Sequence, residues 1–552
     1  MGNLTQPVVL AVTGEQSSAG KLLVSASVSA FILHQVFFKR VEVDFRPVSL
    51  GAGLGAAFII LVYCFGFLLA LASSVSFLLS LWVNMLVYRL AFHPLKHFPG
   101  PVPAKLSKFW AVKKVLDSNY QWYKVALSLK AKYGDYVRTG PREILIFDPE
   151  AIAPVLGYSS KTLKGPFYDS MEDSVNTTRD KEFHRKRRKI WDNAMKTSLA
   201  DYAPRIEDFT DKLIARIGRH ADQAIVLNDL MIHYSYDVMS LLAYGKSMGF
   251  VEGKSTDVAD SILKNIMDGV YAIGLLLHVP WLFTIVTTFA FAIGPLKQWN
   301  DWSRHEVDER REVKNPKPDL MTHLIASTPD DHAGRELLFS ESRLIISAGS
   351  DTTATALTFL FVLLSLQEQS TTLANLRAEL DTVFSKPSDD KEAFSCMRPL
   401  PMLDAVINEG LRLYPSVYFP SQRVTPAAGM TINGRYIPGD TIISIPAYAL
   451  SHDPRCFEQP DEFIPERWTT RPELTINKTG FMPFMTGPYD CAGKKLAMME
   501  LRSVVARIVK DWDWRVIGEE GKKWDREAWF GGVKDHFIAG APKARVVFEK
   551  RV

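Results

Sequence analysis

Residues 484–493, FMTGPYDCAG, carry the strongest signal in this chain. Cys491 lies directly ahead of KKLAMMELRSVVARIV, whose apolar residues repeat at helical spacing. A cysteine in that position faces the positive end of the helix dipole, which favours the thiolate that binds metals. Gly487 and Gly493 permit tight turns and a close approach to a flat ligand, and Phe484 can pack against the loop. The loop therefore predicts a thiolate ligand, although an isolated cysteine is more often a buried, inert thiol.

Residues 340–366, SESRLIISAGSDTTATALTFLFVLLSL, predict a long apolar helix with a polar centre. Gly, Asp and Thr are modest to poor helix formers, and such a local conflict often marks a functional site. A glycine beside a hydroxyl allows the helix to widen locally, and Asp351 with Thr352 would form a proton relay. The alternative is that the threonines bond back to helix carbonyls and Asp351 pairs with a buried base.

Glu409 and Arg412 stand three residues apart in LDAVINEGLRLYP, so they share one helix face. An exposed pair of this kind contributes little to stability. The apolar residues around this pair indicate burial instead. Arg467, in the sequence PERW at 465–468, is predicted to complete a buried three-member network.

Residues 179–189, RDKEFHRKRRK, hold seven basic and two acidic residues. Most of these side chains are expected to form a solvated helix face. His184 and Arg188 are one helical turn apart and can reach an anionic cofactor. The remaining charges offer a docking surface to an acidic redox partner.

Residues 48–87 are almost uncharged and long enough for two membrane spans of about 20 residues each, with a break expected near Ser73-Ser74. Residues 22–38 are a weaker third candidate. The segment 1–92 is therefore interpreted as a membrane anchor of one to three helices, with a buried hydrophobic helix pair as the alternative. Six basic residues follow and place the C-terminal part in the cytosol by the positive-inside tendency: Arg89, Lys96, Lys105, Lys108, Lys113 and Lys114.

Residues 93–103, HPLKHFPGPVP, contain four prolines and predict a stiff hinge, after which 104–552 form the catalytic domain. This part is predicted to be mainly α with small β-sheets (α+β), with hairpins in 135–148 and 430–444. The apolar stretch 271–294 is interrupted by a proline and is expected to be a buried or membrane-dipping helical hairpin.

The chain has 65 basic and 61 acidic residues, a near balance that predicts no nucleic-acid partner. The cysteines are widely separated, which argues against a disulfide framework and for a reducing compartment. They are Cys64, Cys396, Cys456 and Cys491.

The order of hinge, basic helix, A-G-x-D-T-T, E-x-x-R, P-E-R-W and F-x-x-G-x-x-x-C-x-G resembles the cytochrome P-450 superfamily over residues 93–552. It is most similar to membrane-anchored microsomal members from fungal secondary metabolism, such as terpenoid biosynthesis. The resemblance implies haem b and insertion of one oxygen atom from O2 into an apolar small molecule. It also implies electrons from NADPH through a separate NADPH-cytochrome reductase, with cytochrome b5 as a further candidate partner. The expected location is the endoplasmic reticulum membrane, with a cytosolic catalytic domain.

The resemblance assigns roles to individual residues. Cys491 would bind the haem iron, within a loop formed by Phe484, Gly487 and Gly493, and Asp351 and Thr352 would deliver protons. Glu409, Arg412 and Arg467 would form a structural triad. His184, Arg188 and Arg423 would bind the haem propionates. The substrate pocket would include the segment 271–294 and six residues: Phe167, Tyr168, Ala348, Tyr418, Phe419 and Phe530.

One position departs from the family pattern. Tyr489 stands where members usually have Arg or His, and a phenol supplies one hydrogen bond but no charge. Retention of haem is therefore expected to depend more on Arg188 and Arg423.

Other functions are weighed against monooxygenation. A haem-thiolate isomerase or dehydratase needs no reductase, but it also has little need of the Asp351-Thr352 relay. A non-enzymatic membrane haem sensor would not need that relay either. A transporter or receptor would need membrane spans along the whole chain, whereas the apolar stretches gather near the N-terminus.

Overall fold

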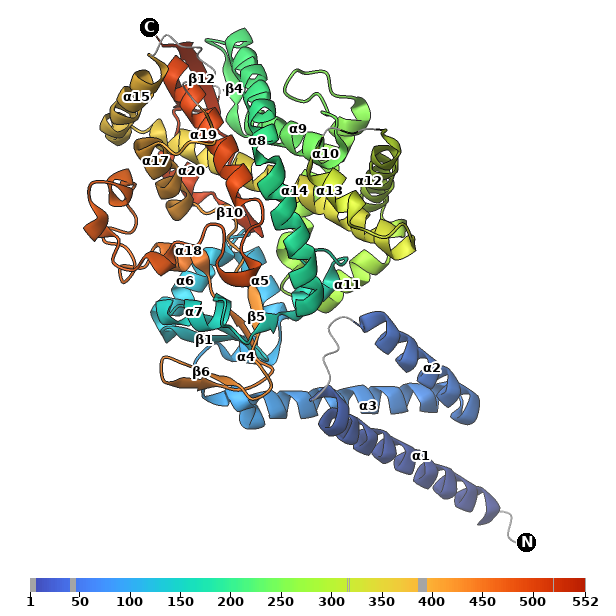
Figure 1. Ribbon diagram of the computed structural model, residues 1–552. Helices are drawn as coiled ribbons and strands as arrows, with labels where there is room; N and C mark the ends of the chain where they lie inside the picture. The colour runs from blue at the N-terminus through green and yellow to red at the C-terminus, as the bar shows by residue number, and fades with distance from the viewer. Residues whose placement is uncertain are drawn as a thin grey trace.

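The structure, a computed structural model, describes residues 6–39, 46–314, 316, 318–385, 395–519 and 521–551. Most of them form a body of helices with small sheets at its side, from which three N-terminal helices project (Figure 1). The prediction of a mainly α fold with small sheets is therefore confirmed. The projecting helices are α1 (Gln6–Leu33), α2 (Pro47–Phe65) and α3 (Phe67–Val87).

The α-helices of the body follow in chain order. They are α4 (Val102–Leu106), α5 (Phe109–Asp117), α6 (Trp122–Tyr133), α7 (Ile152–Leu156), α8 (Lys181–Arg219), α9 (Leu227–Tyr244), α10 (Asp257–Leu276), α11 (Pro280–Thr288), α12 (Gly294–Glu312), α13 (Leu320–Ala326), α14 (His332–Leu364), α15 (Ser370–Phe384), α17 (Pro401–Leu413), α18 (Ala447–Ser451), α19 (Lys494–Asp511) and α20 (Arg526–Gly531). Short 3-10 helices that bear on the site are η5 (Pro166–Ser170), η8 (Pro465–Trp468) and η11 (Gly487–Tyr489).

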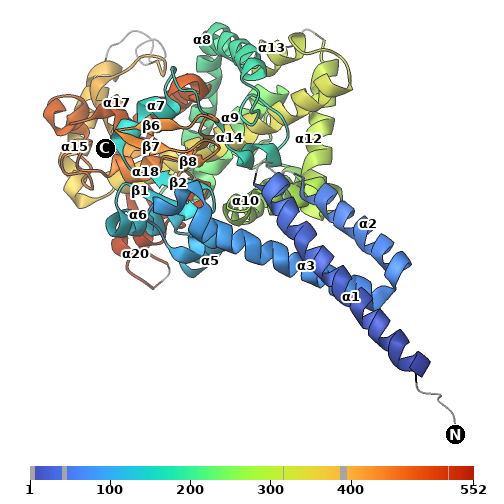
Figure 2. The ribbon, with the colours of Figure 1, turned by 90° about the horizontal axis from the view of Figure 1, so that it is seen from below.

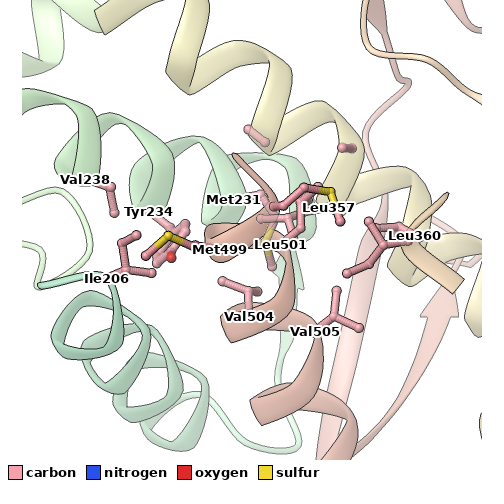
Figure 3. Packing of buried hydrophobic residues seen from close by; sticks show 14 of the residues in the cluster. Ile206, Met231, Tyr234, Val238, Leu357, Leu360, Met499, Leu501, Val504 and Val505 are labelled. Carbon is pink, nitrogen blue, oxygen red and sulfur yellow. The ribbon is translucent and has the colours of Figure 1, made fainter. Parts of the chain in front are cut away.

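Four helices, α8, α9, α14 and α19, pack their apolar faces together in the centre of the body (Figure 3). Gly349 of α14 faces α9, where a Cβ atom would lie 2.4 Å from the terminal carbon of Met239. The glycine thus lets the two helices approach closely. Helix α14 is α-helical throughout. The local widening expected beside Gly349 is not seen, because the side chain of Met239 on α9 fills the space next to the glycine.

The largest sheet has the order β1-β2-β8-β5-β3 and lies beside the helical core. The predicted hairpin in 135–148 is confirmed as β1 (Tyr136–Gly140) and β2 (Glu143–Ile146). The turn at Asn433 and Gly434, with φ of 45° and 72°, joins β6 (Met430–Ile432) to β7 (Arg435–Ile437) as predicted. The remaining strands are β3 (Leu163–Lys164), β4 (Ala224–Val226), β5 (Gln422–Val424), β8 (Ile442–Ser444), β9 (Trp512–Ile517), β10 (Lys534–His536), β11 (Ile538–Gly540) and β12 (Arg545–Lys550).

The projecting helices are long and apolar enough to cross a membrane, over Ala19–Phe38, Pro47–Phe65 and Phe67–Phe92 (Figure 2). Helix α1 packs along α3, and the hydroxyl of Ser27 contacts those of Ser76 (3.0 Å) and Ser80 (2.9 Å). Such small polar contacts suit helix association in lipid. A fourth apolar helix, α14, is 72% buried in its most apolar part and belongs to the core.

The break between the second and third candidate spans lies at Gly66, not at Ser73-Ser74. Gly66 has φ of 81° and ψ of 161°, which only glycine adopts readily. The serines continue α3, since a hydroxyl is compatible with a helix. The segment 271–294 forms the end of α10, α11 and a 3-10 turn, and α11 contacts α2.

We expect the full-length protein to stay in the membrane pellet after high-salt or alkaline washing, because α1 to α3 expose apolar surface suited to lipid. Deletion of residues 1–92 should release much of it. Release should be incomplete because Phe289 and Phe291 remain exposed next to α11. Changing both phenylalanines to serine in the truncated chain should complete it. Recovery of full-length protein in the soluble fraction would contradict the anchor.

Candidate active site

Cys491 lies between η11 and the first turn of α19. Its N–H donates to the carbonyl of Phe484 (2.9 Å), and the N–H of Gly493 hydrogen-bonds to the sulfur. The side chain is exposed, although the helix that follows is largely buried. Gly487 has φ of 77°, and a Cβ there would lie 1.9 Å from the carbonyl oxygen of Leu156, so no other residue fits. The backbone therefore holds an accessible sulfur at the positive end of α19.

A metal on Cys491 would need further ligands from a cofactor. Among the described residues, no three His, Cys, Asp or Glu side chains lie together to hold an ion. Haem would bring most of the iron ligands itself, and Cys491 would supply the thiolate that the protein contributes. Cys491 is accessible and follows directly on the loop ahead of α19, so it fits that role.

Tyr489 lies at the centre of a group of cationic side chains beside this loop. Its ring centroid is 4.5 Å from that of His184 and 5.0 Å from the guanidinium carbon of Arg423. Burial, reinforced by Lys164 and Arg188, lowers the pKa of His184 to about 4.

The two arginines of this group differ in their partners. Arg188 donates to Asp192 (2.7 Å) and Asp490 (2.8 Å), so it is already paired. Arg423 is 2% exposed, donates to the carbonyl of Gln422 (2.9 Å), and forms no ion pair with any residue that the structure describes. A buried cation without a counter-charge is costly. These side chains therefore fit an anionic cofactor such as haem with its propionates.

On α14, Asp351 faces α9, where the hydroxyl of Tyr236 donates to its carboxylate at 2.9 Å. Burial raises the pKa of Asp351 to about 7, and the hydrogen bond from Tyr236 opposes that rise. The base that the alternative interpretation required is not its partner in this structure. No sequence pattern points to Tyr236, because nothing local shows which residue of α9 faces α14.

Thr352 and Ala348 occupy another side of α14, one turn apart. The hydroxyl of Thr352 donates to the carbonyl of Ala348 at 2.9 Å, which is the back-bond of the alternative interpretation. Ala348 is exposed and Thr352 half-buried, whereas Ser350, Asp351 and Thr353 of the same helix are buried. The carbonyl of Thr352 accepts a bond from Ser416 (2.7 Å), which ties α14 to the loop after α17.

Three of the six predicted pocket residues share one aromatic cluster. Phe167 and Tyr168 of η5 contact each other, and Phe167 also contacts Phe419, with ring centroids 5.4 Å apart in both pairs. Phe283 of α11 and Phe537 join them, and Phe537 stacks on Phe419 at 5.7 Å. Phe537 carries no sequence signal of its own, because it lies at the tip of the short β10-β11 hairpin, for which the sequence has no clear turn motif.

Tyr418 and Phe530 lie outside this cluster. Tyr418 packs against Tyr123 and Tyr448, with ring centroids 5.0 and 4.7 Å away. Phe530 stacks on Tyr414 at 5.2 Å and lines a surface cavity of about 210 Å³. Their rings therefore pack against other aromatic side chains and do not belong to the cluster around Phe167 and Phe419.

Glu409 is the centre of a fully buried network between α17 and η8. Its carboxylate accepts bonds from Arg412 (2.9 Å) and Arg467 (2.9 Å), and from the indole of Trp468 (2.9 Å). The remaining guanidinium donors reach backbone carbonyls of the segment 451–474. The network thus fixes the chain that leads into the cysteine loop.

Comparison with known sequences decides the family, because a sequence model of cytochrome P450 matches residues 99–535. The chain belongs to this family. Cytochrome P450 monooxygenase orf5 of Eupenicillium brefeldianum is 36% identical, over 86% of this chain and 95% of its own length. Cytochrome P450 monooxygenase notG' of Aspergillus versicolor is 31% identical over 97% and 99% of the two chains. Tryprostatin B 6-hydroxylase of Aspergillus fumigatus is 31% identical over 86% and 84%.

In this cytochrome P450, Glu409→Gln should lower the free energy of unfolding by roughly 3–5 kcal/mol, since it leaves buried guanidinium charge uncompensated. The measurement is urea or thermal unfolding of the haem-loaded protein. Glu462→Gln is the matched control, because the Glu462 side chain is exposed and forms no ion pair among the described residues. Equal stability of the two variants would show that the network contributes little.

Proposed function

We propose that this cytochrome P450 monooxygenase inserts one oxygen atom from O2 into an apolar small molecule of fungal secondary metabolism. Two features of the structure together carry the proposal. Cys491 is accessible just ahead of α19, and one side of α14 is accessible and bears the hydroxyl of Thr352. The first can hold the haem iron and the second can deliver protons. The fungal monooxygenases among its relatives support the reaction class.

Haem, when bound, would supply the activation of dioxygen. The chain would hold it through Cys491, whose charge the N–H of Gly493 tempers. Arg423 and His184 would bind its carboxylates on one edge. Phe484 and Gly487 would shape the loop that brings the backbone close to the ring.

Asp351 and Thr352 would move protons. A carboxyl whose pKa is about 7 can both hold and release a proton near neutral pH. Tyr236 would orient that carboxyl, and the hydroxyl of Thr352 lies on the next residue of α14. Rotation of the Thr352 hydroxyl away from the Ala348 carbonyl would let it pass the proton on.

The aromatic cluster around Phe167, Phe419 and Phe537 supports an apolar substrate. The name of one relative states that it hydroxylates tryprostatin B. Terpenoids, fatty acids and prenylated indole compounds are therefore the panel to screen, with the enzyme expressed beside a reductase and the products identified by mass spectrometry.

Electrons would come from NADPH through a separate membrane-bound reductase, with cytochrome b5 as a further donor. Lys186, Lys189 and Lys196 of α8 border a surface cavity of about 510 Å³. The same helix carries Arg188, which contacts Asp490 beside the cysteine. A basic surface so close to the haem ligand suits an acidic redox partner. The basic residues after α3 support a cytosolic catalytic domain on the endoplasmic reticulum.

Cys491→Ala should abolish the strongly red-shifted Soret band of the reduced carbon-monoxide complex, because the thiolate ligand is lost. The other three cysteines are free thiols, and the same change at Cys64, Cys396 or Cys456 should leave the band in place. The measurement is a reduced-minus-oxidised spectrum in carbon monoxide. A normal band in the Cys491 variant would refute the assignment.

Turnover should fall as pH rises through the pKa of Asp351, because the protonated carboxyl is the donor. Tyr236→Phe removes a bond that lowers this pKa, so the fall should move to higher pH. Asp351→Asn should slow turnover by roughly 10²–10⁴-fold and abolish that limb. The measurement is the pH profile of turnover.

Thr352→Ala is the matched comparison for these variants. It should keep the pH limb while lowering the ratio of product formed to NADPH consumed, with the difference appearing as hydrogen peroxide. Unchanged coupling would mean that the hydroxyl serves only its helix. Activity with an added peroxide and no reductase would favour an isomerase.

A further inference from the structure

Lys164 is a buried cation outside the predicted site. The residue is 3% exposed, and its ammonium donates to the carbonyl of Asn176. An ammonium has three donors, and in the described ranges of the chain Lys164 forms no ion pair. Its nitrogen lies 5.3 Å from the ring centroid of Tyr168 and 4.7 Å from that of Tyr489.

Arg423 stands directly across the sheet from this lysine. Strand β3 pairs antiparallel with β5, and Lys164 and Arg423 are partners in the register. Opposed residues of an antiparallel pair point to the same face, and like charges in such a pair are destabilising. Arg423 is also buried and has no carboxylate partner among the described residues. The pair therefore places two unneutralised cations side by side in the interior.

The ring of Tyr489 lies where the two cations meet, beside the place where a bound anion would neutralise them. The ammonium of Lys164 and the guanidinium of Arg423 both lie against its ring, and His184 contacts it as well. Tyr489 is two residues before the cysteine, in the position from which a cation is expected. Arg188, which could compensate, is engaged by Asp192 and Asp490.

We propose that Lys164 and Arg423 together bind one carboxylate of haem, and that Lys164 supplies the charge that Tyr489 lacks. The inference rests on the proposed function, since the anion is a haem propionate. It also revises the expectation from the sequence, in which Arg188 shared this role with Arg423.

The electrostatics agree with this geometry. Burial, and then Arg423, lower the pKa of Lys164 to about 7. The other groups that face the ammonium are His184, Tyr168 and Tyr489. A bound carboxylate would favour the charged lysine and raise its pKa. Haem binding above about pH 7 would therefore take up a proton, and the affinity for haem should fall as the pH rises.

The test is the rate of haem transfer from the loaded, full-length protein to excess apomyoglobin, below and above the pKa of the lysine. Lys164→Met should release haem about 10-fold faster or more, as expected for loss of a charge-assisted hydrogen bond, and with little dependence on pH. Lys164→Arg should release it slowly at every pH. Lys161→Met is the matched control, because Lys161 is exposed three residues earlier, and it should behave as the parent protein.

A compensating variant separates charge from structure. Lys164→Met combined with Tyr489→Arg returns the cation to the usual position and should restore slow release, or restore haem loading if the single variant loads poorly. If neither this variant nor Lys164→Arg recovers, Lys164 serves only to hold the Asn176 carbonyl and the inference fails. Equal release from Lys164→Met and the parent, both with the red-shifted carbon-monoxide band, also overturns it. Absence of that band in the parent overturns the proposed function itself.

Discussion

The carboxylate of Glu409 neutralises charge at a point where two guanidinium groups meet in the interior. One negative charge shared by Arg412 and Arg467 leaves surplus donors, and these are satisfied by the carbonyl at the end of α18 and by carbonyls of the irregular segment that follows it. That segment has little regular secondary structure of its own. Its conformation is therefore set by a polar centre, and the position of Cys491 depends on it through the chain that follows.

The two sides of helix α14 have different surroundings. Gly349 and Asp351 face α9, where close packing and the hydroxyl of Tyr236 fix their environment. Ala348 and Thr352 face away from that contact and are accessible. A carboxyl that is shielded from water thus lies one residue from a hydroxyl that is not. In the proposed mechanism this arrangement would pass protons while the apolar packing keeps bulk water out.

The motifs were readable from the sequence because each is local: three or more residues on one turn or loop, with spacing set by helix geometry. The pairing of Glu409 with Arg412 is local in this sense, whereas Arg467 joins the network from a distant segment and is predicted from the PERW motif. Lys164, Tyr236 and Phe537 carry no local signature, since their roles arise from contacts between segments far apart in the chain. The predicted position of the break between the second and third spans is wrong, because Ser73 and Ser74 are compatible with a helix. The chain breaks instead at Gly66, whose backbone angles are not helical.

Strand β3 is only two residues long and lies at the edge of its sheet. Edge pairing of that length contributes little, and here the repulsion between Lys164 and Arg423 opposes it. A bound carboxylate turns the same contact from repulsive to attractive. On the proposed binding of haem, the pairing of β3 with β5 would be more stable in the loaded protein than in a newly made chain without haem, whose edge would open to proteases and chaperones more often. Abundance of the protein in the cell would then follow cofactor availability by mass action.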